Sequence, residues 1–327
     1  MTGAGGMLGQ DVVRAARARR HGVHGLPRTK LDICDADAVA AALGRHQPDV
    51  VINCAAYTDV DGAESDEERA FEVNGTAPGV LARGCRGVGA RLIHVSTDYV
   101  FDGQADRPYV ESDAVGPRSA YGRTKLAGEL EVLGAGGGHA VVRSSWLFGA
   151  GGRCFPATML RLADGPVGGG AGDGAGGGGR SEVSVVTDQL GCPTFTGHLA
   201  AALVELAERL AAEGPEPGGR GAPDATAGLG ATAPAGGIHH IAGSGQCSWN
   251  EFAVEIFAQA AVDCAVLGAS SADLARPARR PAWSVLGSER PDAISLPAWE
   301  HGLSAFLTEI GRRVRGVGGP AHQGVAR

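Results

Sequence analysis

Tyr121 and Lys125 stand four residues apart in the stretch "YGRTK", and both side chains can take part in proton transfer. Four residues make about one helical turn, so on a helix the two side chains share a face. A lysine ammonium beside a phenol lowers the phenol pKa from about 10 toward neutral pH. We therefore predict that Tyr121 donates a proton to a carbonyl oxygen as hydride reaches the carbon, and that Lys125 supports it and holds a cofactor ribose. Lys125 and Lys30 are the only lysines in the chain.

Thr97 is the candidate third member of this group. It ends the apolar run "ARLIHVST" at residues 90–97, which is typical of a buried strand. Open α/β sheets place their sites at the carboxyl ends of the strands. A hydroxyl group there can hydrogen-bond the reacting carbonyl and stabilise the negative charge that develops on its oxygen.

A glycine-rich turn near the N-terminus, "TGAGGMLGQD", is a candidate nucleotide-binding loop. Its glycines Gly3, Gly6 and Gly9 are three residues apart. This spacing lets the backbone turn tightly, approach a pyrophosphate and pack the next helix, whose N-terminal N–H groups face the phosphates. The chain holds 54 glycines, so the spacing alone is a weak signal, but the helix predicted from residue 10 gives it the right context.

Arg28 indicates which dinucleotide this loop would hold. About 20 residues beyond such a loop, an acid usually marks a contact with the ribose of NAD. Here the second predicted strand ends near Leu26 and is followed by Arg28. Because an arginine can accept a 2′-phosphate, we predict NADPH as the cofactor, with NADH as the alternative.

Strand-like and helix-like segments alternate in the first half of the chain. This order predicts an α/β fold with a doubly wound parallel sheet. The predicted strands are residues 48–56, 90–97 and 139–149, and the predicted helices are residues 10–20, 63–87 and 118–133.

Composition excludes several classes of protein. The chain has 327 residues, 43% hydrophobic and 20% charged, with a net charge of −7. It therefore has no broad excess of positive charge that would bind nucleic acid or an anionic membrane.

The seven cysteines are scattered along the chain, without a C-x-x-C pair. This argues against a zinc site and against a disulfide framework, and it favours the reducing cytoplasm. We expect no metal, no nucleic acid and no membrane among its partners.

Several stretches together resemble one family. They are "TGAGGMLG", "DVVINCAAYTDVDGAE", "VSTDYVFDG", "YGRTKLAGE", "VRSSWLFG", "DQLGCPT" and "RPARRPAWSVL". The chain resembles the dTDP-4-dehydrorhamnose reductases, which are extended short-chain dehydrogenase/reductases, over roughly residues 2–310. The resemblance implies a Rossmann-like fold and NADPH-dependent reduction of the 4-keto group of dTDP-4-dehydro-L-rhamnose. We expect the protein to be a monomer or a homodimer.

The resemblance also implies roles for individual residues. Thr97, Tyr121 and Lys125 would form the catalytic triad. The cofactor would contact Gly3, Gly6, Met7, Leu8, Arg28, Asp32, Ile33, Ala55, Ala56 and Tyr57, as well as Tyr121 and Lys125. The sugar would face Thr97, Asp98, Tyr99 and Trp146. Trp283 departs from the pattern, because the family usually has Asn or another small polar residue there.

Three other functions stay open at this stage. A reductase of a different dTDP-4-keto-6-deoxysugar would share these motifs. A non-catalytic nucleotide-binding regulatory subunit often lacks the Tyr or the Lys, whereas both are present here. A nucleotide-sugar epimerase or dehydratase usually has acids beside the strand-end threonine, and "STDYVF" supplies only Asp98.

We divide the chain into an NADPH-binding domain at 1–150 and a mostly substrate-binding part at 151–310. Glycine-rich segments at 165–180 and 213–237 are expected to be insertions, and 311–327 a disordered tail. A glycine loop of this kind normally follows a buried strand, and only Met1 and Thr2 precede it. We therefore expect the first strand to be missing and Met1 to be a mis-assigned or substituted start.

Overall fold

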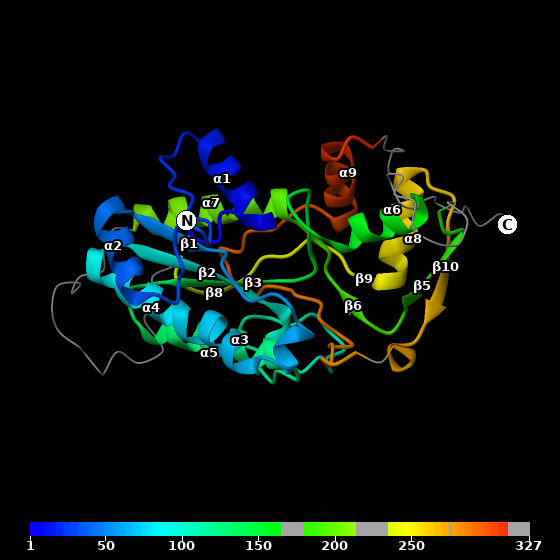
Figure 1. Cartoon of the computed structure of the whole chain (residues 1–327), viewed down its shortest axis with the longest axis horizontal. Helices are drawn as coiled ribbons and strands as arrows, with labels where there is room; N and C mark the ends of the chain where they lie inside the picture. The colour runs from blue at the N-terminus through cyan, green and yellow to red at the C-terminus, as the bar shows by residue number, and fades with distance from the viewer. Residues whose placement is uncertain (165–178, 214–234, 275, 313–327) are drawn as a thin grey trace.

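Four parallel strands form the sheet that organises the protein (Figure 1). A computed structural model describes residues 1–164, 179–213, 235–274 and 276–312. The strands lie side by side in the order β1 (Val50–Asn53), β2 (Arg91–Thr97), β3 (Ala140–Ser144) and β8 (Gly237–His240). Their mostly apolar, β-branched residues are buried, as expected for a parallel sheet that is covered on both faces.

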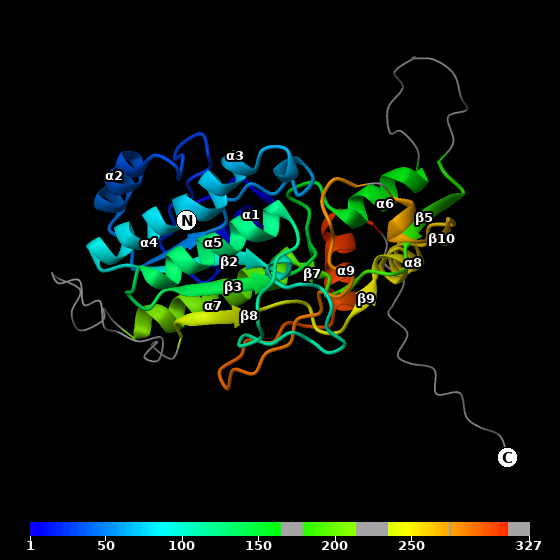
Figure 2. The ribbon, with the colours of Figure 1, turned by 90° about the horizontal axis from the view of Figure 1, so that it is seen from below.

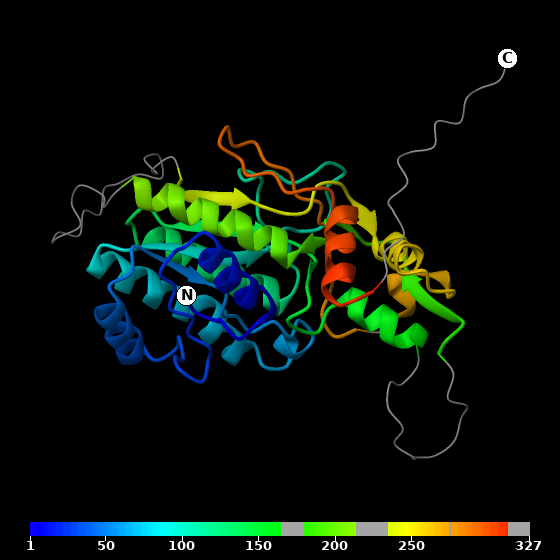
Figure 3. The same cartoon turned by 90° about the horizontal axis from the view of Figure 1, so that it is seen from above.

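Helices cover the two faces of this sheet (Figures 2 and 3). On one face lie α1 (Met7–Ala18) and α7 (Thr196–Ala212), which pack against each other. On the other lie α2 (Ala36–His46), α4 (Ala77–Val88) and α5 (Ala120–Gly134). The predicted doubly wound parallel α/β fold is confirmed.

A second, smaller part of the molecule contains α6 (Phe155–Asp164), α8 (Trp249–Ala260) and α9 (Trp299–Glu309). There β5 (Glu182–Val186) pairs in parallel with β10 (Ala265–Ala269). Two short pairs adjoin it: β4 (Leu147–Phe148) with β7 (Thr194–Phe195), and β6 (Leu190–Gly191) with β9 (Cys247–Ser248). Residues of the later chain also return to the first sheet as α7 and β8, and the division at residue 150 stays a prediction.

The single helix predicted at 63–87 is wrong. The structure has a 3₁₀ turn (Gly62–Glu64), α3 (Glu67–Phe71), a π turn (Glu72–Thr76) and then α4. Pro78 has no N–H to donate to the carbonyl of Asn74, four residues earlier. This carbonyl instead lies against α5, where a Cβ on Gly128 would come within 2.0 Å of it. The irregular turn therefore lets α5 pack closely.

Most of the expected insertions and tail lie outside the described residues. At their edges the boundaries need correction, because Gly237 begins β8 and Glu213 accepts a hydrogen bond from the backbone N–H of Ala235 at 2.8 Å. These two residues therefore belong to the ordered fold around the sheet.

Thr2 occupies the place of a strand between β1 and Leu26. It forms parallel bridges with both Leu26 and Asn53. Its N–H donates to the carbonyl of Ile52 at 3.1 Å, and its own carbonyl accepts from the N–H of Cys54 at 3.2 Å. A single paired residue, Thr2, therefore stands where a strand would lead into the glycine loop.

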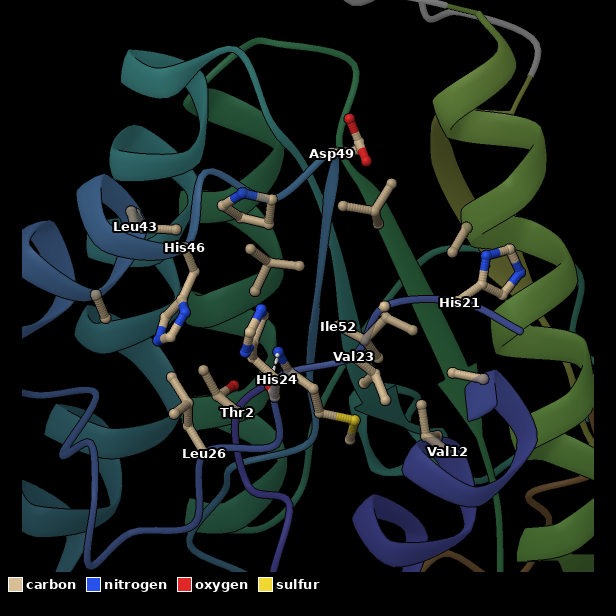
Figure 4. Close-up of a pocket in the computed structure, with 18 of the residues that line it drawn as sticks. Thr2, Val12, His21, Val23, His24, Leu26, Leu43, His46, Asp49 and Ile52 are labelled. Atoms are coloured by element: carbon tan, nitrogen blue, oxygen red, sulfur yellow. Dashed lines mark hydrogen bonds between the residues drawn. The ribbon is translucent and has the colours of Figure 1, made fainter. Parts of the chain in front are cut away.

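A cavity of about 310 Å³ lies behind Met1, between α1, α2, α7 and the edge of β1 (Figure 4). Its walls are largely apolar and include Val12, Val23, Leu43 and Ile52. The terminal amine of Met1 donates to the carbonyl of His24 at 3.0 Å, and burial lowers the pKa of this amine. The cavity has the position and the lining that suit an extended apolar segment in line with Thr2.

We predict that five to seven β-branched apolar residues joined before Met1 will raise the Tm by several degrees or more. Each added ladder hydrogen bond contributes about 0.5–1.5 kcal/mol, and the new side chains fill the cavity. Calorimetry would compare this protein with one that carries a Gly/Ser extension of equal length. Equal melting temperatures for the two extensions would contradict the prediction.

Candidate active site

The start of α5 places Tyr121 beside the carboxyl end of β2. The hydroxyl of Ser119 caps the helix by accepting from the N–H of Gly122 at 3.1 Å. Gly122 allows close approach, because a Cβ there would lie 2.3 Å from the carbonyl oxygen of Tyr99. The first turn of α5 is therefore packed directly on the turn that follows β2.

The phenol of Tyr121 lies near the hydroxyl of Thr97, which acts to lower the phenol pKa. Its ring meets that of Tyr99 edge to face, with centroids 5.5 Å apart, and also packs near Tyr57. Burial, and next the charge of Asp98, raise the pKa of Tyr121. The predicted proximity of Tyr121 to Thr97 is thus present in the structure.

The predicted lowering of the phenol pKa by Lys125 is wrong for this structure. The Nζ atom of Lys125 donates to the carbonyl of Val95 at 2.7 Å and lies 3.2 Å from Nε2 of His94. Burial lowers the pKa of Lys125 itself to about 8, against the opposing influence of Glu129. Tyr121 and Lys125 share one face of α5, but the amine of Lys125 makes its hydrogen bond to the main chain of β2.

A buried ion pair fixes α5 to the sheet one turn beyond Lys125. Glu129 on α5 pairs with Arg143 on β3 at 2.7 Å, and their side chains are 1% and 3% exposed. The same carboxylate accepts a hydrogen bond from Ser96 at 2.5 Å. These contacts join α5 to two adjacent strands in a region of low dielectric.

Asp98 and Tyr99 follow Thr97 in a 3₁₀ turn (Asp98–Val100). The Thr97 hydroxyl donates to Asp98 Oδ1 at 2.9 Å and accepts from the N–H of Tyr99 at 3.2 Å. Burial raises the pKa of Asp98 to about 6, although the hydroxyl of Ser284 nearby and the hydrogen bond from Thr97 oppose it. Ser284 comes from the later part of the chain, so this turn is where the two parts meet.

The glycine loop has the close backbone contacts that its sequence predicts. Gly3 has φ of +68°, and a Cβ on it would lie 2.5 Å from the backbone nitrogen of Ala55. A Cβ on Gly9 would lie 2.2 Å from the carbonyl oxygen of Gly3. Gly6 caps α1 without a side chain, and Met7 and Leu8 form its first turn. The helix N-terminus is therefore open to an anion such as a phosphate.

The other predicted cofactor residues border the same edge of the sheet. Arg28 is exposed two residues after Leu26, and its charge acts on the exposed carboxylate of Asp32. The side chain of Ile33 is instead buried in the core with Leu31. Of these three predicted cofactor contacts, the side chains of Arg28 and Asp32 are thus on the surface. The side chain of Ile33 is not.

Ala55, Ala56 and Tyr57 form a partly buried segment just after β1. The side chain of Asn74 holds this segment at two points, accepting from the N–H of Tyr57 at 2.8 Å and donating to its carbonyl at 3.0 Å. The sequence analysis missed Asn74. Its position in a π turn, a feature common near functional sites, appears only in the structure.

Trp146 lies two residues beyond Ser144, which is the register partner of Thr97. It therefore lies near the same carboxyl edge as the predicted triad. Its ring stacks on that of Trp249, with centroids 3.6 Å apart, and its φ is +47°.

Trp283, which departs from the family pattern, is hydrogen-bonded to the main chain. Its indole N–H donates to the carbonyl of Arg107 at 2.8 Å.

Some features are absent from the part of the chain that the structure describes. In the described ranges no three His, Cys, Asp or Glu side chains are grouped as a metal would need. Among the same residues, no helix is both long and apolar enough to cross a membrane. All seven cysteines are free thiols.

We predict that Gly9→Ala will lower the Tm by several degrees and weaken NADPH binding by about tenfold or more. The added methyl group overlaps the carbonyl of Gly3, and overpacking of this kind costs about 1–3 kcal/mol. Gly5→Ala is the matched control, since its Cβ would lie at an acceptable 3.4 Å from that of Pro27. Calorimetry and a fluorescence titration would measure both effects; two variants that behave alike would refute the prediction.

Comparisons with known proteins agree on one family. The chain is 44% identical to a dTDP-4-dehydrorhamnose reductase of Streptomyces griseus over 98% of this chain and 96% of the relative. It is 41% identical to a Streptomyces antibioticus protein named "Probable dTDP-4,6-dihydroxy-2-methyloxan-3-one 4-ketoreductase", over 89% and 86% of the two chains. A solved dTDP-4-dehydrorhamnose reductase of Bacillus anthracis in complex with NADP has a TM-score of 0.80 at 31% identity, covering 94% of this chain and 97% of that one. Residues 1–312 match the family described as the RmlD substrate binding domain, and the chain belongs to that family.

Proposed function

We propose that this protein reduces the 4-keto group of dTDP-4-dehydro-L-rhamnose with NADPH and forms dTDP-L-rhamnose. The observation that carries the proposal is the closeness of the Tyr121 phenol to the Thr97 hydroxyl, at the sheet edge that also bears the glycine loop. Relatives with this activity in their names align over nearly the whole chain.

The glycine loop supports a dinucleotide at this edge. The backbone spaces beside Gly3 and Gly9 leave no room for a Cβ, and the first turn of α1 has no side-chain cap. Phosphates would lie against the backbone N–H groups there, with Arg28 beside the adenosine ribose. NADPH, when bound, supplies the hydride.

Tyr121 would give its proton to the carbonyl oxygen of the sugar. The raised pKa of the phenol keeps it protonated at neutral pH, which is the state that a proton donor needs. The Thr97 hydroxyl would orient the phenol and hydrogen-bond the same oxygen as negative charge develops on it. Asp98, Tyr99 and Trp146 would face the sugar, and Lys125 would lie toward the cofactor ribose.

A related substrate is the second candidate. The similarity to the Streptomyces antibioticus 4-ketoreductase favours another dTDP-4-keto-6-deoxysugar as the alternative. Purified protein would be assayed with NADPH and a panel of dTDP-4-keto sugars. The largest kcat/KM is expected for dTDP-4-dehydro-L-rhamnose. Preference for another sugar would select the second candidate, and no reduction of any of them would favour a regulatory subunit.

We also propose that the protein works in the cytoplasm as a monomer or a homodimer. Its seven free thiols suit a reducing compartment. Light scattering on the purified protein would decide between the two oligomeric states.

We expect Tyr121→Phe to lower kcat by about 10²-fold or more with little change in NADPH affinity, because positioned proton donation is worth about 10²–10⁴-fold. Tyr109→Phe is the control: that phenol donates to Asp102, and its ring stacks on Phe101. Steady-state kinetics would measure both variants. A Tyr121→Phe enzyme with nearly unchanged kcat would show that Tyr121 is not the acid.

NADPH should be used better than NADH, and Arg28→Ala should reduce this preference by about tenfold, since the guanidinium would pair with the 2′-phosphate. Arg17→Ala removes another exposed arginine, at the far end of α1, and should leave the preference unchanged. The measured quantity is the ratio of kcat/KM for the two cofactors. Equal or better use of NADH by the unaltered protein would contradict the role of Arg28.

A further inference from the structure

Trp146 has a backbone conformation that a large side chain rarely adopts. Its φ of +47° lies in the left-handed region, which is an outlier for a bulky residue. Such conformations persist only where the surrounding structure enforces them, and they cluster at active sites and ligand-binding sites. Trp146 stands in the turn between β3 and β4, at the carboxyl edge that also bears Thr97. The strained turn therefore points to a role at this edge beyond packing.

The main chain around Trp146 is fixed to a neighbouring loop. The hydroxyl of Ser145 donates to the carbonyl of Cys192 at 2.7 Å, and the carbonyl of Trp146 accepts from the N–H of Thr194 at 3.1 Å. Leu147 then pairs with Thr194 in the short ladder between β4 and β7. Because these contacts set the path of the turn, they also set the direction in which the Trp146 side chain leaves it.

Two neighbours enclose the indole ring of Trp146. The ring of Trp249 stacks on it, with centroids 3.6 Å and planes 8° apart. Gly191 also lies against the ring, because a Cβ on it would come within 2.4 Å of Cε2 and 2.6 Å of Nε1. The three atoms nearest to such a Cβ all belong to Trp146 and none to Trp249, although the two rings are in contact. Gly191 and Trp249 therefore lie on opposite faces of the indole.

With a neighbour on each face, Trp146 has its rim to offer to a ligand. The side chain is half-buried, so part of it reaches the surface. Its N–H can only donate a hydrogen bond, and it has no acceptor among the residues that the structure describes. An indole rim places this one donor beside apolar C–H groups. That combination matches a hydroxyl group next to the methyl group of a 6-deoxysugar.

Trp249 is itself firmly held. It is the first residue of α8, and a capping box fixes the start of that helix. The hydroxyl of Ser248 accepts from the N–H of Glu251 at 3.1 Å, and the carboxylate of Glu251 accepts from the N–H of Ser248 at 2.7 Å. Phe155 of α6 packs on Trp249, with ring centroids 4.6 Å apart. Since α6 and α8 belong to the second part of the molecule (Figure 1), the stack joins that part to the edge of the sheet.

We propose that Trp249 and Gly191 are positioning residues that fix the rim of Trp146 as one wall of the sugar site and so determine which 4-keto-6-deoxysugar is accepted. The inference rests on the proposed function, in which Trp146 faces the sugar, and deepens it. Both residues act through Trp146 and not by contact with the sugar. A Trp249 side chain that only filled the core would have no influence on the choice between sugars.

Three variants separate this role from core packing. Trp249→Leu removes the stacked ring, whereas Trp249→Phe keeps an aromatic ring in its place. Trp299→Leu is the matched control, because the ring of Trp299 also meets Phe252 of α8 but does not stack on Trp146. Trp249→Leu is expected to raise the KM for the sugar by about tenfold, since misplacing a positioned group by about 1 Å can cost as much as about 100-fold. It is also expected to weaken the preference among dTDP-4-keto sugars, with little change in kcat or NADPH affinity.

Calorimetric titration with dTDP-L-rhamnose tests the same site without turnover. We expect its Kd to rise in Trp249→Leu and to stay near that of the unaltered protein in Trp249→Phe and Trp299→Leu. If KM, Kd and sugar preference were unchanged in Trp249→Leu, or changed equally in Trp299→Leu, the inference would be overturned while the proposed function stood. An unaltered protein that neither reduces nor binds any of these sugars would overturn both.

Discussion

The attachment of α5 to β2 and β3 is the contact on which the rest of the site depends. Glu129 reaches Arg143 on one strand and Ser96 on the next, and all three side chains are buried. Removing one partner of such a pair typically costs about 3–5 kcal/mol, because the other charge is left buried. Tyr121 and Lys125 lie on the same helix within two turns of Glu129. Their positions against Thr97 and Val95 are therefore fixed together.

Burial then determines the protonation states in this site. It raises the pKa of Tyr121, raises that of Asp98 to about 6 and lowers that of Lys125 to about 8, so at neutral pH the phenol is protonated while Asp98 and Lys125 are mostly charged. A protonated phenol is a ready proton donor at neutral pH. Here the phenol lies near Thr97, and the amine of Lys125 donates to the carbonyl of Val95 in β2 and lies beside His94.

Local sequence patterns were sufficient for the parallel sheet and the glycine loop. A continuous apolar run such as that ending at Thr97 identifies a buried strand, and glycine spacing identifies close backbone approach. Side-chain pairs between elements were not predictable in this way. The Asn53–His94 contact depends on the register of β1 against β2, and the Glu129–Arg143 pair depends on how α5 lies across the sheet. Helical spacing placed Tyr121 and Lys125 on one face, but it could not identify the partner of the amine.

Transfer of deuterium tests the central claim, reduction at the 4-keto carbon, most directly. Purified protein would be incubated with dTDP-4-dehydro-L-rhamnose and NADPH that carries deuterium on the nicotinamide C4, with both stereoisomers of the cofactor used in turn. NMR of the dTDP-sugar product is predicted to show deuterium at C4 of the deoxysugar with one of the two. A product without deuterium, or with deuterium at another carbon, would contradict the account.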